Sequence, residues 1–169
     1  MDQTQQIINT IKEHKSVLDE DTSYEVIELV IFKIDTISYG FYGRDIKEII
    51  AYNTITFVPG CPETIMGIIN VRGDIESVLN LHKIINKPTS PPSRHSRIVL
   101  AECDGIRSGI LVDSVDDVLT ISKHEIFDTI STLDQGIRSY VDCITMYQNN
   151  YVPIIDIGKL FQTITNQQK

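Results

Sequence analysis

Two stretches of this sequence occur twice in the same order, and this internal duplication is the feature that most restricts the fold. Residues 35–50 align with 104–119, and residues 78–85 align with 154–161. The first offset is 69 residues and the second is 76, which places about seven inserted residues within the second copy. Only two copies at so long a period are not typical of a solenoid. We interpret the chain as two similar subdomains.

The aligned positions carry identical or chemically similar residues. They include Asp35 with Asp104, Ile37 with Ile106, Gly40 with Gly109, Ile46 with Val115, Glu48 with Asp117, and Ile49 with Val118. The surrounding sequence is rich in β-branched and aromatic residues, which favour strands. Runs with the length of strands cover residues 28–34, 38–42, 65–71 and 75–79. The pattern predicts two small β-barrels, each followed by a short helix, of which the first begins at Leu81.

One segment between the predicted strands is ambiguous. From Arg44 to Ile50, three isoleucines recur at helical spacing, which predicts a helix, although a strand remains an alternative for the second half. Residues 87–96 contain three prolines and three serines, and they suit neither a helix interior nor a sheet. We therefore expect a linker there. The expected organisation is an N-terminal helix and acidic linker at 1–22, a main domain at 23–162 and a tail at 163–169, with subdomains at about 35–86 (plus pairing strands) and about 97–155.

The N-terminal segment has an amphipathic pattern of its own. From Gln3 to Leu18, the apolar residues Ile7, Ile8, Ile11 and Leu18 fall near one helical face, with Val17 beside it. The acidic residues Asp19, Glu20 and Asp21 then lead into the β-rich region. The segment is expected to form a helix. A docking helix and a loosely attached tail both remain open.

Composition excludes several classes of function. The chain has 169 residues, a net charge of −8 and no cluster of Lys and Arg, which argues against binding to nucleic acid or an anionic membrane. No apolar run approaches the roughly 18 residues that span a bilayer, and the N-terminus lacks the features of a secretory signal. The three cysteines are far apart and form no Cys-x-x-Cys pair, which is typical of a reducing compartment. We expect a cytoplasmic protein.

The sequence contains no arrangement of residues that predicts catalysis. The four histidines lack the spacing of a metal site, and no glycine-rich phosphate loop occurs. In Gly105–Gly109, Ser108 is displaced from the centre where a nucleophile elbow holds its serine, and it aligns with Tyr39 of the first copy. We expect Ser108 to lie on a strand. The chain is predicted not to be an enzyme and to bind no cofactor or metal.

The segment from Ile65 to Leu81 closely resembles the CheW family, in which an apolar strand reaches Asn-x-Arg-Gly, turns and returns as a second apolar strand. Residues 32–42, 46–50 and 58–60 resemble the family's opening, and residues 109–119 resemble its second subdomain. The resemblance covers about residues 24–162. It implies a mostly β fold of two intertwined, five-stranded, SH3-like barrels that share a core. It also implies a non-catalytic adaptor that couples the cytoplasmic tips of chemoreceptors to the regulatory domain of a histidine kinase in signalling arrays.

The resemblance also implies roles for individual residues. Ile46 and Glu48 match the region that the family uses toward the kinase. The receptor-facing residues are Arg72, Val115 and Val118, while Asn70 and Gly73 shape the turn beside Arg72. A structural role remains the alternative for Arg72, and the three aliphatic residues could equally belong to the core.

Two departures from the family pattern accompany this resemblance. Glu76 and Ser77 stand where a proline is usual, and Asp142 stands where a glycine is common. They suggest a divergent or accessory member. The isolated protein is expected to be monomeric, with no direct insertion into the membrane. A relative that serves pilus or gliding motility is the alternative function, and a small β-barrel enzyme or ligand-binding protein is a third.

Overall fold

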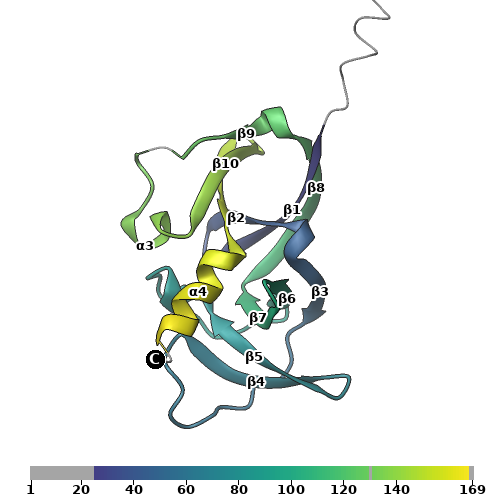
Figure 1. The fold of residues 1–169 in the computed structure, drawn as a ribbon, viewed down its shortest axis with the longest axis vertical. Helices are drawn as coiled ribbons and strands as arrows, with labels where there is room; N and C mark the ends of the chain where they lie inside the picture. Colours follow the sequence, from purple (N-terminus) through teal and green to yellow (C-terminus); the bar gives the residue numbers. More distant parts are fainter. Residues whose placement is uncertain (1–24, 130, 168–169) are drawn as a thin grey trace, which may run out of the picture.

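The fold is known from a computed structural model that describes residues 25–129 and 131–167 (Figure 1). The helix expected at Gln3–Leu18 therefore lies outside the described residues. Within the described ranges, the strands form two sheets joined by short helices, and the prediction of a mostly β protein is confirmed.

The larger sheet has the strand order β8-β1-β2-β11-β10-β9. Its members are β1 (Val26–Ile34), β2 (Ile37–Tyr42), β8 (Ser114–Ser122), β9 (Ile126–Phe127), β10 (Val141–Tyr147) and β11 (Asn150–Ile155). Neighbouring strands are antiparallel except for β2 and β11, which run parallel. The larger sheet thus has six strands where five were expected for each barrel, because the two-residue β9 is added beside β10.

The smaller sheet has five strands in the order β3-β6-β7-β5-β4. Its members are β3 (Ile46–Ala51), β4 (Ile65–Val71), β5 (Asp74–Asn80), β6 (Arg97–Cys103) and β7 (Ile106–Val112). The helical elements are η1 (Gly43–Asp45), α2 (Leu81–Ile84), η2 (Lys123–Glu125), α3 (Gln135–Arg138) and α4 (Ile157–Gln167). The helix predicted from Arg44 to Ile50 is wrong, because a single 3-10 turn is followed directly by β3. Its isoleucines are β-branched, and pairing with β6 outweighs their helical spacing.

Each sheet takes strands from both sides of residues 87–96. The β1–β2 hairpin precedes this segment but lies in the sheet of β8 to β11, and the β6–β7 hairpin follows it but lies in the sheet of β3 to β5. Two parallel pairings hold the exchanged hairpins, Gly40 with Ile154 and Gly109 with Val78. Because Gly40 aligns with Gly109 and Val78 with Ile154, these two pairings are equivalent in the duplication.

The antiparallel registers repeat in the same way. Ile46 of β3 pairs with Ala101, and its aligned residue Val115 of β8 pairs with Phe32, which lies 69 residues before Ala101. A register shift follows immediately at the equivalent place in both pairs of strands. The duplication therefore extends to backbone irregularities, and β3 and β8 hold equivalent positions at the ends of the two sheets.

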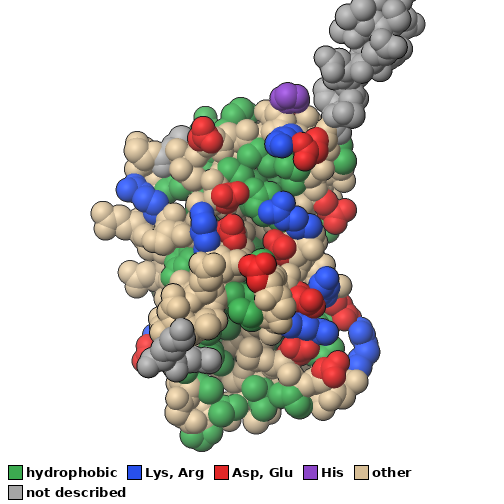
Figure 2. All heavy atoms as spheres, in the orientation of Figure 1, with side chains coloured by type: hydrophobic (Ala, Val, Ile, Leu, Met, Phe, Trp, Pro, Cys, Tyr) green, Lys and Arg blue, Asp and Glu red, His purple; other side chains and the backbone are tan. Residues whose placement is uncertain are grey.

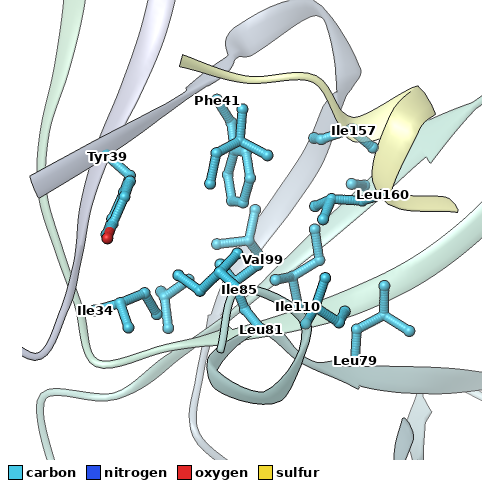
Figure 3. Close-up of a cluster of buried hydrophobic side chains, with 14 of the residues drawn as sticks. Ile34, Tyr39, Phe41, Leu79, Leu81, Ile85, Val99, Ile110, Ile157 and Leu160 are labelled. Atoms are coloured by element: carbon cyan, nitrogen blue, oxygen red, sulfur yellow. The ribbon is translucent and has the colours of Figure 1, made fainter. Parts of the chain in front are cut away.

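A single apolar core lies between the sheets (Figure 3). It combines Phe32 and Phe41 of one sheet, whose rings stack at 4.2 Å, with Val99 and Ile110 of the other. Helix α4 closes one side with buried side chains that include Leu160. Each sheet also encloses a smaller apolar cluster on its other face. Burial of this apolar surface is the main force that holds the two sheets together.

Candidate partner-binding site

Strand β3 carries both residues expected to face a kinase. β3 ends the strand order of the smaller sheet, and it pairs with β6 on one side. Ile46 is partly buried and packs against the shared core. The Glu48 side chain is 29% exposed. Both side chains are therefore partly buried, and Ile46 is in part used for packing against the core.

Arg72 lies at the tip of the β4–β5 hairpin, in the turn that the sequence predicts. Arg72 and Gly73 both have positive φ, 51° and 93°, which glycine tolerates well and arginine adopts only at some cost. The Gly73 N–H donates to Asn70 Oδ1 at 2.9 Å. Asn70 and Gly73 thus lie where they can shape the turn that presents Arg72.

Arg72 forms an ion pair with Glu48, so the structure brings these two predicted site residues together. The pair joins the β4–β5 hairpin to β3, although β4 and β3 stand at opposite ends of the strand order. The sheet must curl for them to meet, as expected of a small barrel. The Arg72 side chain stays 75% exposed, and an exposed pair of this kind contributes only about 0–1 kcal/mol to stability.

The second copy has a related contact at the equivalent place. Asp117, which aligns with Glu48, accepts a hydrogen bond from the Tyr147 hydroxyl at 3.1 Å. This contact joins β8 to the tip of the β10–β11 hairpin, as the ion pair joins β3 to the β4–β5 hairpin. Both copies therefore have a contact at this place, but the first copy has an ion pair and the second has a hydrogen bond from a neutral hydroxyl.

Strand β8 carries the two valines expected to face a receptor, and the structure separates their roles. Val115 is partly buried and packs against the shared core, whereas Val118 is 53% exposed. β8 is backed by β1, and Lys33 of β1 forms an ion pair with Asp116 at 3.0 Å. Of the two valines, Val118 offers apolar surface to a partner.

Comparison with known proteins matches this architecture to a family. A model of the CheW-like domain matches residues 28–165. The chain belongs to the CheW-like family. It is 30% identical to the chemotaxis protein CheW of Thermotoga maritima over 152 residues, which cover 89% of this chain and 96% of that protein. It is 26% identical to the chemotaxis protein CheW of Bacillus subtilis over 140 residues, or 83% of this chain and 90% of the relative.

A solved structure supports the same assignment. The scaffolding protein TtCheW from Thermoanaerobacter tengcongensis superposes with a TM-score of 0.69 and 31% sequence identity, covering 77% of this chain and 88% of that one. The chain is thus a chemotaxis scaffold of the CheW-like family. Among the described residues, no helix is long and apolar enough to cross a bilayer.

Some exposed residues near the expected sites were not predicted from the sequence. Tyr52 and Phe57 follow β3 and are 38% and 70% exposed, and Ile75 beside the Arg72 turn is 61% exposed. In a CheW-like chain, exposed aromatic side chains beside an edge strand are candidate anchors for a partner. Strand alternation could have indicated Ile75, but Phe57 lies in an irregular segment whose exposure only the fold determines.

Polar side chains that were considered as possible catalytic or metal-binding groups form structural contacts instead. Ser108 lies on β7, is 3% exposed, and donates to the Ser77 carbonyl at 3.0 Å. His82 is 2% exposed, and its Nε2 lies 3.1 Å from a carboxylate oxygen of Asp113. Within residues 25–129 and 131–167, no group of three or more His, Cys, Asp or Glu side chains is placed to hold a metal ion.

The residues that depart from the family pattern also have local partners. Glu76 is 7% exposed and pairs with Arg107 at 2.9 Å, which compensates the charge on this buried carboxylate. Asp142 accepts a hydrogen bond from the Tyr42 hydroxyl at 3.0 Å. Both residues are therefore accommodated without loss of the strands that carry them.

Proposed function

We propose that this chain is a non-catalytic adaptor that couples chemoreceptors to a chemotaxis histidine kinase. Its partners are the kinase regulatory domain and the cytoplasmic tip of a receptor. It acts as a monomeric unit in the cytoplasm, at the inner face of receptor arrays. The proposal is supported by membership of the CheW-like family and by two equivalent end strands, β3 and β8, that expose different side chains.

The kinase-binding surface centres on β3. Glu48 supplies a partly exposed carboxylate that is paired with Arg72, and Ile46 contributes the part of its side chain that the core leaves exposed. Tyr52 and Phe57 extend this surface with aromatic side chains. An apolar centre with a charged rim is the usual composition of such an interface, in which the charge sets orientation and specificity.

The receptor-binding surface uses Arg72 and Val118, with Val115 holding β8 against the core. The observation that carries this assignment is that Arg72 stays 75% exposed although it pairs with Glu48. A structural arginine at a turn would be expected to bury its guanidinium against its partner. An exposed guanidinium held in one orientation is suited to donate to a carboxylate or carbonyl of a second protein.

Arg72→Glu tests this assignment in the full chain. Because the ion pair is exposed, the variant should fold with nearly unchanged stability, and its affinity for a receptor tip fragment should fall at least about tenfold, or about 1.4 kcal/mol. Arg94→Glu is the matched control, since Arg94 is also exposed but lies in the 87–96 segment. Affinities would be measured by calorimetry and folding by circular dichroism. Unchanged receptor binding by a folded Arg72→Glu protein would remove the assignment.

A further inference from the structure

A cavity of about 200 Å³ lies between helix α4 and strands β4, β5 and β7 of the smaller sheet. These elements meet beside the yellow helix in Figure 1, and Figure 2 shows hydrophobic side chains among uncharged ones over the smaller sheet below α4. No charged side chain is among the described residues that line the cavity. The lining residues are Ile65, Ser77, Leu79, Ile106, Ser108, Phe161, Ile164 and Thr165.

The larger sheet fills the equivalent place with its own side chains. Ser108 aligns with Tyr39, and Ser77 aligns with Pro153. The Tyr39 side chain is 2% exposed and belongs to the shared core. Figure 3 shows Tyr39 at one end of this core and Leu79, which lines the cavity, at the other end. Two serines thus stand where the larger sheet has a tyrosine and a proline, and these smaller side chains leave space beside α4.

The hydroxyl groups of the cavity leave one acceptor unused. Ser108 Oγ has a single proton, which it donates to the Ser77 carbonyl at 3.0 Å, and Ser77 Oγ then donates to Ser108 Oγ at 2.8 Å. Thr165 Oγ1 donates to the Phe161 carbonyl at 3.0 Å. In this arrangement, none of the described residues donates to Ser77 Oγ. An aromatic ring with a hydroxyl group would therefore find both an apolar wall and a hydrogen-bond acceptor.

Two exposed isoleucines extend the apolar surface beyond the cavity. Ile75 is 61% exposed and Ile106 is 41% exposed. Strands β5 and β7 are parallel with Val78 opposite Gly109, and the same register places Ile75 opposite Ile106 on the face that lines the cavity. A molecule of the size of one ring would leave much of these side chains exposed. A protein segment can cover them and fill the cavity at the same time, as anchor residues of protein interfaces do.

We propose that this cavity binds a tyrosine side chain of a partner protein, whose neighbouring aliphatic residues cover Ile75 and Ile106. The buried Tyr39 ring shows that the equivalent place in the other sheet holds such a side chain. A cavity of about 150 Å³ in another protein holds benzene, so the 200 Å³ available here is enough for one ring. Ile75 lies three residues after Arg72, so the site borders the receptor-binding surface proposed above but does not depend on that assignment.

The test adds the peptide acetyl-Lys-Ile-Tyr-Ile-Lys-amide to the full chain and follows amide NMR signals. Signals of Ser77, Ile106 and Ser108 should shift and saturate, with a dissociation constant on the order of mM. Replacing the peptide's tyrosine by alanine should weaken binding at least about tenfold, and replacing both of its isoleucines by alanine at least about threefold. All three peptides carry the same charge. Equal binding without the tyrosine would overturn the proposal, and equal binding without the isoleucines would overturn a protein as the source of the ring.

Variants of the cavity test the same contact from the other side. Ser108→Tyr introduces the side chain of the aligned position, which should fill the cavity and weaken peptide binding at least about tenfold. Ser108→Ala is the matched control, because it leaves the space open and should keep the affinity within about threefold. Thr165→Phe covers the cavity from an exposed position of α4, so it tests the proposal even if Ser108→Tyr does not fold. Circular dichroism checks folding. Unchanged peptide binding in a folded Ser108→Tyr or Thr165→Phe protein would overturn the proposal.

Discussion

Gly67→Ala perturbs the contact between strand β4 and the segment around Thr56. Gly67 lies at the register shift between β4 and β5 and has φ of 146°, a conformation that side chains with a Cβ rarely adopt. An alanine Cβ would meet the Thr56 carbonyl oxygen at 2.1 Å and the Thr56 carbonyl carbon at 2.8 Å. Because both atoms belong to the backbone, the clash is relieved only when the segment around Thr56 moves away from β4.

The expected loss of stability has two parts. Moving the segment breaks two hydrogen bonds, from Thr56 N to the Ile68 carbonyl at 2.8 Å and from Ile68 N to the Thr56 carbonyl at 2.9 Å. At about 0.5–1.5 kcal/mol each, they contribute about 1–3 kcal/mol. The unfavourable φ adds about 1–3 kcal/mol. The sum, about 2–6 kcal/mol, is a large share of the 5–15 kcal/mol that is typical of whole domains.

Urea denaturation followed by circular dichroism measures this loss, with Gly73→Ala as the matched control. Gly73 also has positive φ, 93°, but a Cβ there would have no atom within 4 Å. The control therefore loses stability only through the unfavourable backbone conformation. Gly67→Ala should therefore be less stable than Gly73→Ala by about 1–3 kcal/mol, and its Thr56 and Ile68 amides should exchange faster. Equal stability of the two variants, with unchanged exchange, would refute the reasoning.

Two further predictions concern the core and the response to pH. Phe161→Ala removes a side chain that is 3% exposed and should cost about 3–5 kcal/mol in urea denaturation, whereas Gln162→Ala on the exposed face of α4 should change little. Burial, Cys143 and Asp142 together raise the pKa of Tyr42 above its ordinary value of 10.0. The folded protein then retains a proton that the unfolded chain loses, so stability should fall as pH rises above about 10. In Tyr42→Phe, the midpoint of urea denaturation should fall less steeply above about pH 10 than in the unaltered protein. An equally steep fall in both proteins would contradict this role of Tyr42.

The duplication visible in the sequence predicts a surprising amount of backbone detail. Asp35 and Asp104 align, and both have positive φ, 56° and 51°, in the turns of equivalent hairpins. The strand runs 28–34 and 65–71 fall within or match β1 and β4. These features depend on local preferences of Asp, Gly and β-branched residues, which act in the same way in both copies.

Features that depend on distant partners could not be predicted. The spacing of Ile46, Ile49 and Ile50 fits a helix or a strand, and only pairing with β6 decides between them. The ion pair of Arg72 with Glu48 requires the two ends of a sheet to meet, which no local pattern encodes. The difference between Val115 and Val118 likewise depends on tertiary packing, because Val115 packs against the shared core whereas Val118 is 53% exposed.

The exchange of hairpins has a consequence for the two proposed binding surfaces. β3, which carries Glu48, pairs with β6 from beyond the 87–96 segment, and β8, which carries Val118, pairs with β1 from before it. Each end strand is therefore held by a hairpin from the opposite half of the sequence. Neither surface can keep its position if the other half separates, because the pairing partner would leave with it. The shared core thus fixes Val118 on β8 relative to Glu48 on β3, and the Arg72–Glu48 ion pair joins the two proposed surfaces directly. The proposed adaptor needs such a fixed arrangement if it is to hold two proteins in one relative orientation.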